Sequence, residues 1–329
     1  MLIIASIIIP SAGHRPKLLE RAVKSALIDN DQIQTEVIVI LNGKKGMLFD
    51  ESTSFQHPLV KYYKLEEGNV SKARNYGLSI AQGELIRFLD DDDYLIPEVA
   101  YQQYTELYNS DADLSTYAGA IEDDVKRYQV INPIDIDDYC AATLSEYCPA
   151  LTFATSYKIK IIKKLKWDEN ISITEDENWM RSIAASQKIK WIKGNDVVAI
   201  WYQHNFTRLS FPISHPVYYK NRCISILETI DILKKDNRLS KDLQNISATG
   251  LWSAIHGGFY FNPIYWTKIG LYTRKLDPNS RPSDPFFQEL PNWIHPLIIE
   301  WLMLPKRWMN HQFRRLKYKL GCSSYIRKI

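Results

Sequence analysis

The chain is poor in the features that mark secreted, metal–thiolate and membrane-spanning proteins. Its 329 residues include four cysteines: Cys140, Cys148, Cys223 and Cys322. These show neither the close spacing of a zinc site nor the pattern of a disulfide framework, so we expect free thiols in a reducing compartment. No apolar run reaches the roughly 18 residues of a membrane span. The nearest one, residues 296–304, contains Glu300.

The N-terminus is apolar but lacks the marks of a secretory leader. Residues 1–10 have no basic start and no cleavage site, and their apolar run is short. We therefore expect a buried first strand and a cytoplasmic protein. With 45% apolar and 24% charged residues, the composition is that of an ordinary globular protein. A chain of 329 residues is long enough for one large domain and a smaller one.

An acidic run follows a short apolar segment in the first third of the chain. Residues 84–89 read as a strand and lead directly into residues 90–93, which are all aspartate. Adjacent carboxylates repel one another, and burial beside an apolar strand adds a desolvation cost, so the run favours a bound cation. Oxygen ligands select hard ions such as Mg²⁺ or Mn²⁺, which commonly share their shell with substrate phosphates. The alternative is a solvated loop that caps the helix predicted after Pro97, and for Asp93 we prefer this capping role.

Strand-like and helix-like segments alternate through the first two thirds of the chain. The predicted strands are residues 2–9, 36–41, 59–63, 84–89, 113–120, 151–157, 189–192 and 197–202. Helical spacing occurs at residues 18–27, 71–81, 97–108 and 158–165, and from residue 174 onward. This alternation favours a doubly wound α/β domain, whose ligands bind beyond the carboxyl ends of the strands. Ser11, Asn42 and the acidic run all lie at such ends, so we group them in one site.

Local patterns add detail to this prediction. Ser71 is suited to cap the helix of residues 71–81, and Thr174 with Glu177 has the spacing of a capping box. Residues 121–133 are polar and predict irregular chain. The dipeptide Gly194-Asn195 predicts a turn between the last two strands.

The character of the chain changes near residues 211–216. Beyond this point, residues 217–235 and 239–255 have helical patterns with no strand between them, and the remainder is rich in Trp, Tyr and Pro. We therefore predict two domains: residues 1–211 form the α/β domain, and residues 212–329 form a smaller, mainly helical region.

The C-terminal segment, residues 306–328, is rich in basic residues and almost free of acids. With its interleaved Trp and other apolar residues, it suits the interface of an anionic membrane. The alternative is a helix packed on the catalytic domain with a solvated basic face. Nucleic acid is a poorer partner, because no recognised reading module accompanies the basic residues.

Three segments together resemble the inverting glycosyltransferases of family 2, which have the GT-A fold. The first is Ile7-Ile8-Ile9-Pro10-Ser11 with Arg15, similar to the family's opening strand and donor-binding turn. The second runs from Gly68 through Ala73-Arg74-Asn75-Tyr76-Gly77 and Gly83-Glu84 to Phe88-Leu89-Asp90-Asp91-Asp92-Asp93, and is similar to the ARNxG, GE and FLDxDD signature. The third, Thr174-Glu175-Asp176-Glu177, resembles the Glu-Asp motif. The resemblance covers roughly residues 1–211.

The resemblance implies a Rossmann-like GT-A domain with a mixed, doubly wound sheet. It implies transfer of a sugar from a nucleoside diphosphate, most commonly UDP, to an acceptor hydroxyl with inversion. Asp92 is then the direct ligand of Mn²⁺ or Mg²⁺, whereas Asp90 and Asp91 lie nearer the ribose and the waters of the metal. Asp176 is the implied general base, and its neighbour Glu175 holds the site or the acceptor.

The further predicted donor-binding residues are Pro10, Ser11, Arg15, Asn42, Lys72 and Arg74. Asn42 departs from the family, which usually has two acids after the second strand; its amide can bind a base or ribose but carries no charge. His204 follows the last predicted strand, where related enzymes often direct a histidine or basic residue toward the diphosphate or metal. Simpler roles remain open: a surface charge for Lys72, a structural histidine for His204, and helix-dipole stabilisation for Glu175 and Asp176.

The implied partners are a nucleoside-diphosphate-sugar donor and a saccharide acceptor. A basic C-terminal segment would suit a lipid-linked acceptor of polysaccharide, O-antigen or capsule synthesis, at the inner face of the plasma membrane. An alternative enzyme class is a nucleotidyltransferase, which also needs a phosphate-bound metal. Such an enzyme would have a glycine- and arginine-rich loop directly after the first strand, and residues 11–16 resemble one only faintly. A protein that binds a sugar nucleotide without turning it over is permitted by Asn42, whereas an intact Asp92 and Asp176 argue against it.

Overall fold

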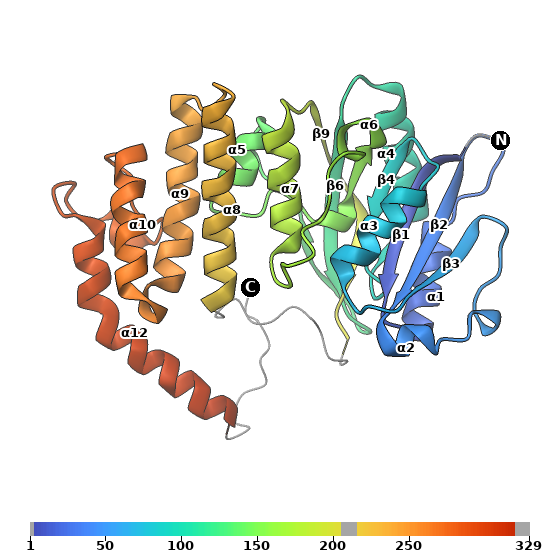
Figure 1. The fold of residues 1–329 in the computed structure, drawn as a ribbon, viewed down its shortest axis with the longest axis horizontal. Coiled ribbons are helices and arrows are strands. Elements are labelled where there is room, and N and C mark those ends of the chain that lie inside the picture. The colour runs from blue at the N-terminus through green and yellow to red at the C-terminus, as the bar shows by residue number, and fades with distance from the viewer. Residues whose placement is uncertain (1–2, 205–215, 320–329) are drawn as a thin grey trace. The chain divides into compact units, whose positions relative to one another are not determined.

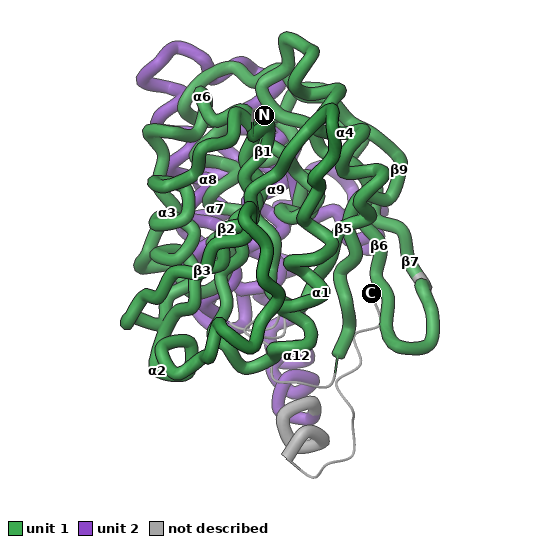
Figure 2. Tube along the Cα trace, turned by 90° about the vertical axis from the view of Figure 1, so that its right-hand side faces the viewer, with its two compact units in different colours: residues 1–143, 147–210 green, residues 144–146, 211–329 purple. Residues whose placement is uncertain are grey.

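The computed structural model of the chain describes residues 3–204 and 216–319. The chain divides into two compact units, one of Met1–Thr143 with Tyr147–Ser210 and one of Leu144–Glu146 with Phe211–Ile329. Figure 2 shows the two units in different colours. The predicted boundary near residues 211–216 lies almost wholly outside the described residues, as do the last residues of the basic C-terminal segment.

The first unit contains a mixed sheet. Its strands are β1 (Ile3–Ser11), β2 (Gln34–Asn42), β3 (Val60–Leu65), β4 (Leu85–Phe88), β5 (Tyr94–Leu95), β6 (Leu114–Glu122), β7 (Arg127–Ile131), β8 (Thr155–Lys158) and β9 (Trp191–Tyr202). They are arranged in the order β3-β2-β1-β4-β8-β6-β9-β5, with β7 paired to β6. The strands β3, β2, β1 and β4 run parallel, whereas β8 pairs antiparallel with both β4 and β6. The α/β sheet predicted from the alternating pattern is therefore confirmed.

Helices cover both faces of the parallel part of the sheet (Figure 1). The helices of this unit are α1 (Pro16–Ala26), α2 (Gly43–Met47), α3 (Val70–Ile80), α4 (Pro97–Asn109), α5 (Tyr139–Leu144), α6 (Ile159–Ile162) and α7 (Glu175–Ser186), with short 3-10 turns at Glu51–Thr53 and Thr152–Ala154. Successive strand residues point to opposite faces. Val37 and Val39 of β2 accordingly join the core that contains residues of α1 and α4. Ile38 and Ile40 instead pack with Ala73 of α3. Because both faces are covered, residues 7–9 of β1 and 37–41 of β2 are all apolar, and the buried Ser6 and Glu36 are hydrogen-bonded to each other.

The carboxyl ends of β1, β2 and β4 meet at one edge of the sheet. Ser11 of β1 is opposite Leu41 of β2, and Ile8 is opposite Phe88 of β4. The side chain of Asn42 donates a hydrogen bond of 3.1 Å to the backbone oxygen of Ser11. The parallel register therefore brings the polar ends of these strands together, as the sequence pattern predicted.

Two predicted helix caps are wrong. The cap of α3 is Asn69, whose side chain accepts from the backbone N–H of Lys72, and Ser71 lies inside the helix. Thr174 precedes α7 in a left-handed conformation with φ of 72° and makes no capping hydrogen bond. Its hydroxyl donates instead to the backbone oxygen of Ile173. The first error is a choice between neighbouring polar residues, and the second follows from the left-handed backbone of Thr174; local propensity resolves neither.

Two strand predictions are also wrong. Residues 189–192 and 197–202 are not separated by a turn, because β9 runs continuously from Trp191 to Tyr202. It bulges where Thr116 pairs with Lys193 but Ala118 pairs with Val197, so the polar insertion is absorbed by a β-bulge. Residues 121–133 are not irregular, since they contain β7, which pairs with β6.

The second unit is helical. Its helices are α8 (Pro216–Lys235), α9 (Lys241–Gly258), α10 (Pro263–Leu276), α11 (Pro285–Gln288) and α12 (Pro296–Lys319), with a 3-10 turn at Phe259–Phe261. Ile226 and Ile230 of α8 and Leu251 and Trp252 of α9 are buried. Gly250 allows a close helix contact, because a Cβ there would lie 2.2 Å from the backbone oxygen of Leu144.

We expect Gly83→Ala to lower the free energy of unfolding by about 1–3 kcal/mol, the usual cost of overpacking. A Cβ at Gly83 would lie 2.6 Å from the carbonyl carbon of Ala5 and from the nitrogen of Ser6, in the middle of β1. Urea denaturation measures the effect. The matched control is Gly68→Ala, whose Cβ would lie 3.4 Å from the Cα of Gly43. Equal stability of the two variants would contradict the prediction.

Candidate active site

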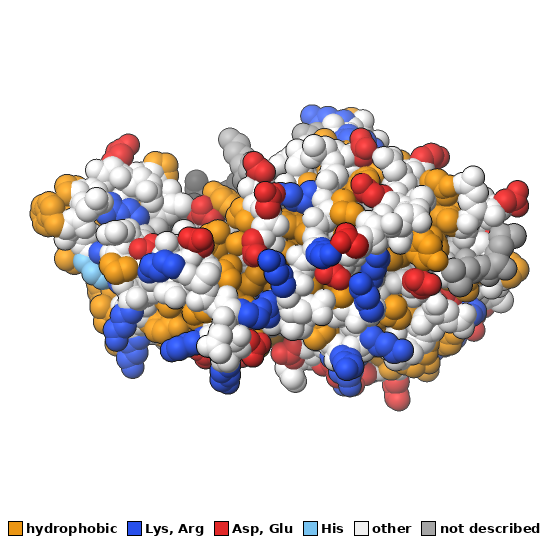
Figure 3. Space-filling model, turned by 90° about the horizontal axis from the view of Figure 1, so that it is seen from above, with side chains coloured by type: hydrophobic (Ala, Val, Ile, Leu, Met, Phe, Trp, Pro, Cys, Tyr) orange, Lys and Arg blue, Asp and Glu red, His pale blue; other side chains and the backbone are white. Residues whose placement is uncertain are grey.

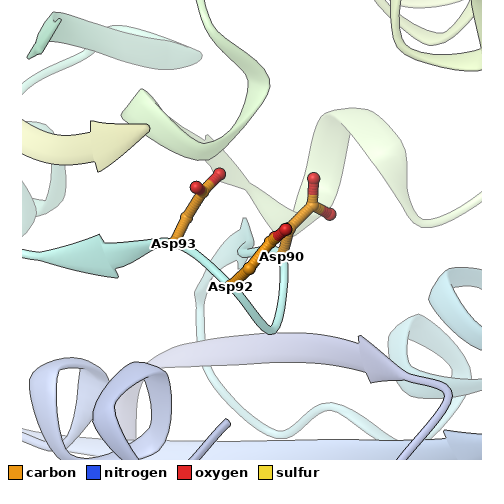
Figure 4. Close-up of side chains that lie close together, drawn as sticks. All are labelled: Asp90, Asp92 and Asp93. Atoms are coloured by element: carbon orange, nitrogen blue, oxygen red, sulfur yellow. The ribbon is translucent and has the colours of Figure 1, made fainter. Parts of the chain in front are cut away.

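The acidic run forms the short loop between β4 and β5. Asp91 and Asp93 are buried, whereas Asp90 and Asp92 are partly exposed. Carboxylate oxygens of Asp90, Asp92 and Asp93 lie within 4.8 Å of one another, and these three side chains project from the same side of the loop (Figure 4). Three oxygen donors at this separation suit a hard divalent cation such as Mg²⁺ or Mn²⁺.

Asp93 does not cap the following helix, contrary to our prediction. Its Oδ1 accepts a hydrogen bond of 2.9 Å from the backbone N–H of Tyr202, the last residue of β9. The residue at the cap position of α4 is Ile96, which makes no capping hydrogen bond. Asp93 therefore ties the loop to the end of β9 and adds a third carboxylate to the group, a role that only the pairing of distant strands reveals.

Arg15, at the start of α1, binds two of the aspartates. Its Nη2 donates to Asp91 Oδ1 at 2.5 Å and its Nη1 donates to Asp92 Oδ2 at 2.6 Å. Burial works against the charge of Arg15, but the two carboxylates outweigh it and raise the pKa of the guanidinium. Arg15 therefore neutralises part of the negative charge of the loop.

Both carboxylate oxygens of Asp91 accept hydrogen bonds. While Oδ1 accepts from Arg15, Oδ2 accepts a hydrogen bond of 2.5 Å from the hydroxyl of Ser11. Burial raises the pKa of Asp91 to about 6, although Arg15 and Ser11 act in the opposite direction. Asp91 is thus the aspartate that anchors the loop to the end of β1, and it lies outside the group of three that could hold a cation.

His204 reaches the same aspartate as Arg15. Its Nε2 lies 2.7 Å from Asp92 Oδ2 and 2.8 Å from Arg15 Nη1, and its side chain is 4% exposed. The structure therefore places the predicted histidine directly against the acidic run. Asp92 thus has both a guanidinium and an imidazole within hydrogen-bond distance.

Arg21 is a part of the site that sequence reasoning missed. Its Nη2 donates a hydrogen bond of 2.9 Å to the backbone oxygen of Asp92. Its guanidinium lies 4.4 Å from the ring centroid of Tyr94 and 3.8 Å from that of Tyr202, distances typical of cation–π contacts. Nothing in the spacing of α1 marks Arg21, because only the packing of α1 against β5 brings it to the loop.

A second arginine, Arg74 of α3, connects the acidic run to α7. Its Nη2 donates to Asp90 Oδ1 at 2.9 Å, and its Nη1 donates to Glu175 Oε1 at 3.3 Å. The side chain is 5% exposed and lies 4.3 Å from the ring centroid of Trp167. Burial opposes the charge, but the surrounding acids raise the pKa of Arg74. Arg74 is therefore the residue that joins the two acidic motifs, which are far apart in sequence.

Glu175 and Asp176 are the first two residues of α7. Asp176 Oδ1 accepts a hydrogen bond of 2.8 Å from the backbone N–H of Glu177. The pKa of Asp176 is raised to about 7, mainly because the carboxyl is shielded from water and further because Glu175 and Glu177 are negatively charged neighbours. A carboxyl that ionises near neutrality is suited to take a proton from a hydroxyl group.

The remaining predicted residues have different positions. Pro10 is buried near the end of β1. Asn42 links the ends of β1 and β2, because its Nδ2 donates to the backbone oxygens of Ser11 and Ile40. Lys72 pairs with Glu67 and lies 4.0 Å from Glu169, both outside the acidic run.

Trp179 is part of the core, and Trp201 packs against it. Trp179 is fully buried and stacks on Trp167, with 4.7 Å between ring centroids and 7° between ring planes. Trp201 packs against the core on the side of α1 and α4.

Comparison with known proteins gives a family and a fold. The sequence model of the family described as Glycosyl transferase family 2 matches residues 6–190. The Minor teichoic acid biosynthesis protein GgaB of Bacillus subtilis (strain 168) is 28% identical over 139 residues. That alignment covers 39% of this chain and 15% of GgaB, so the chain spans only a small part of that relative.

Solved structures of S. aureus TarS 1–349 have a similar fold. The structure in complex with UDP-GlcNAc is 16% identical to this chain and has a TM-score of 0.60. A second structure of TarS 1–349 is also 16% identical and has a TM-score of 0.58. Each match covers 84% of this chain and 82% of the other. The GT-A α/β fold followed by a helical region, predicted from the sequence, is confirmed.

We expect Asp176→Asn to stabilise the protein more at pH 8 than at pH 5. The pKa of Asp176 is about 7 in the folded protein, against the usual 3.8, so ionisation of this carboxyl costs more free energy in the folded protein than in the unfolded chain. This carboxyl therefore lowers the free energy of unfolding as the pH rises from about 4 to 7. An uncharged amide in its place does not ionise, so it avoids this decrease in stability at pH 8. Thermal melting at both pH values measures the difference.

The control for this prediction is Asp50→Asn. Hydrogen bonds from Ser52 lower the pKa of the exposed Asp50, so this amide should be slightly destabilising at pH 5 and pH 8 alike. An increase in melting temperature on Asp176→Asn that is larger at pH 5 than at pH 8 would contradict the prediction.

Proposed function

Because this chain belongs to Glycosyl transferase family 2 and is a glycosyltransferase, we propose that it inverts the anomeric carbon of a nucleoside-diphosphate sugar in a single displacement. The observation that carries this proposal is the link made by Arg74 between the acidic run and the start of α7. A cation-binding group and a carboxyl with a pKa near 7 are thereby held in one site, as donor activation and acceptor deprotonation require.

In the proposed reaction an acceptor hydroxyl attacks the anomeric carbon of the donor sugar. The new carbon–oxygen bond forms as the bond to the diphosphate breaks, and that electron pair leaves with the diphosphate. Asp176 takes the proton of the attacking hydroxyl as general base. Glu175 is held by Arg74 and positions the acceptor side of the site. The attack is in line, so an α-linked donor gives a β-linked product.

We propose that a divalent cation, Mn²⁺ or Mg²⁺, is held by Asp92 together with Asp90 and Asp93. The carboxylate oxygens of these three residues are within 4.8 Å of one another, and such a donor set fits a hard cation. When bound, the cation acts as a Lewis acid that stabilises the negative charge of the departing diphosphate. Arg15 and His204, which contact Asp92, are the proposed additional contacts toward the diphosphate.

We propose a UDP-linked donor. The fold is similar to that of S. aureus TarS 1–349, which was solved in complex with UDP-GlcNAc. The amide nitrogen of Asn42 is occupied by Ser11 and Ile40, so its oxygen is the group left to accept a hydrogen bond from the base or ribose. Pro10, Ser11 and Asp91 are the further proposed donor contacts; Ser11 donates to Asp91 where the ends of β1 and β4 meet.

We propose that the acceptor is a saccharide on a growing surface polymer. The 139-residue similarity to a minor teichoic acid biosynthesis protein supports this class of acceptor. Such polymers grow on a lipid carrier in the general case, and the nucleotide sugar is supplied inside the cell. The proposed place of action is therefore the inner face of the plasma membrane.

The test of the proposed donor is a thermal-shift series with UDP, GDP, CDP and their sugars, each with Mn²⁺ and with chelator. A ligand that binds only the folded protein raises its melting temperature, by an amount that grows with concentration over Kd. We expect a rise with UDP or a UDP-sugar that chelator removes. A protein stabilised by none of the nucleotides would contradict the proposal, and slow release of UDP from the bound sugar to water would distinguish a transferase from a protein that only binds the donor.

We expect Asp92→Asn and Asp176→Asn to separate donor binding from transfer. Asp92→Asn should abolish the Mn²⁺-dependent rise in melting temperature with UDP. Asp176→Asn should keep that rise and lower kcat by roughly 10²–10⁴, the usual contribution of a general base. Asp111→Asn is the control, because this exposed carboxylate pairs with Lys190 at the surface. Equal loss of donor affinity in the Asp92 and Asp176 variants would rule out the division of roles.

A further inference from the structure

The last helix of the second unit is α12, shown in Figure 1, and a buried ion pair holds it to that unit. Glu300 is fully buried, and its carboxylate accepts from Arg307 Nη1 at 2.6 Å and lies 2.8 Å from His256 Nδ1 of α9. Arg307 also donates to the backbone oxygen of His256 at 2.9 Å. Leu297 is buried on the same side, against Gly270 of α10. One side of α12 is therefore a packed structural surface.

A second side of α12 is apolar and exposed. We call it the α12 stripe, and it consists of Ile298, Trp301, Leu302, Trp308, Met309 and Phe313. These side chains are between 44% and 71% exposed. Each of them is three, four or seven residues from another member along the helix, so they lie along one side of it. Trp301 is at the margin of the stripe, where its Nε1 donates to Thr267 of α10. Clusters of this size on a protein surface usually mark a binding face.

The charge of α12 has one sign. From residue 301 to residue 319 the sequence contains six Lys or Arg residues and no Asp or Glu. The single acid of the helix, Glu300, is buried and paired with Arg307, so the other five basic residues have no acid on this helix to offset them. Figure 3 gives a contrast: on the face drawn there, Lys and Arg side chains are interspersed with Asp and Glu.

We propose that the α12 stripe docks on an anionic lipid bilayer, lying in the headgroup region with its axis along the surface. Tryptophan, leucine, methionine and phenylalanine side chains suit the boundary between headgroups and acyl chains, and adjacent basic residues are attracted by anionic headgroups. In the part of the chain that the structure describes, no helix is long and apolar enough to span a membrane. The docking is peripheral, through one side of one helix.

Charge and apolar surface together favour a bilayer over other occupants. A symmetric contact between two copies would bring the same surface of each together, and the two basic helices would repel one another. A nucleic acid would use the positive charge but would leave the apolar side chains of the stripe without a partner, since phosphate contacts dominate its binding. An anionic bilayer satisfies both properties of the helix.

The test is co-sedimentation of the full chain with vesicles of phosphatidylcholine alone and of phosphatidylcholine with phosphatidylglycerol. We expect binding to the anionic vesicles and much weaker binding to the neutral ones, since each basic residue near the surface contributes roughly fivefold. Leu302→Gln with Met309→Gln should weaken binding to anionic vesicles by about tenfold or more, because it removes apolar contact without changing charge. Lys306→Gln should lower the same binding by about fivefold.

The matched control is Leu48→Gln with Val125→Gln. These residues are 84% and 88% exposed and lie in the first unit, so their replacement should leave vesicle binding unchanged. Melting temperature shows that each variant is folded. Unweakened binding by the stripe variant, or equal binding to both kinds of vesicle, would overturn the proposal. So would a dimer in light scattering that the stripe variant dissociates while no vesicles are bound.

Docking on a bilayer would place the protein where a lipid-linked acceptor lies, and this consequence rests on the proposed function. The vesicle experiment needs neither nucleotide nor acceptor, whereas the thermal-shift series needs no lipid. Failure of one is therefore distinguishable from failure of the other.

Discussion

The site depends on how the repulsion among clustered carboxylates is balanced. Four aspartates follow β4, and three further acids begin α7. Arg15 neutralises Asp91 and Asp92, while Arg74 bridges Asp90 and Glu175. Without these arginines the acids could share one site only by taking up protons or by binding a cation. At Asp176 burial, and to a smaller extent the charges of Glu175 and Glu177, raises the pKa to about 7, and a carboxyl that ionises near neutrality is suited to accept a proton.

The parallel sheet supplies the geometry for this balance. Because β1, β2 and β4 run in the same direction, their polar ends lie at one edge, where Ser11 binds Asp91 and Asn42 binds the backbone of Ser11. The far side of the loop is tied down by the bond from the N–H of Tyr202 to Asp93. A loop fixed at both ends presents its remaining carboxylates in defined positions, so little reorganisation is needed when charge develops in a reaction.

The helical unit shows a different use of charge. Glu300 is fully buried against the partly exposed Arg307 and His256, which is tolerable because its carboxylate is paired with Arg307. The same pairing fixes the rotation of α12 within its unit and thereby decides that Leu302 and Met309 face outward. Amphipathic patterning of α12 was visible in the sequence as basic residues among aromatic ones. Which apolar residues are exposed was not, because that depends on which side of the helix α9 and α10 cover.

The local sequence pattern was enough to predict the α/β sheet, the strand ends that carry polar residues, and the acidic loop. Each of these features is an apolar run together with the residues that directly follow it, so it can be read from consecutive positions in the chain. The cap at Ser71 was mispredicted because the neighbouring Asn69 competes for the same backbone groups, and the one at Thr174 because its backbone is left-handed. The bulge in β9, the bond from Tyr202 to Asp93, the contact of Arg21 with the loop and the bridge made by Arg74 needed the tertiary structure. Each joins residues that only strand pairing or helix packing brings together, and no local pattern encodes such a contact.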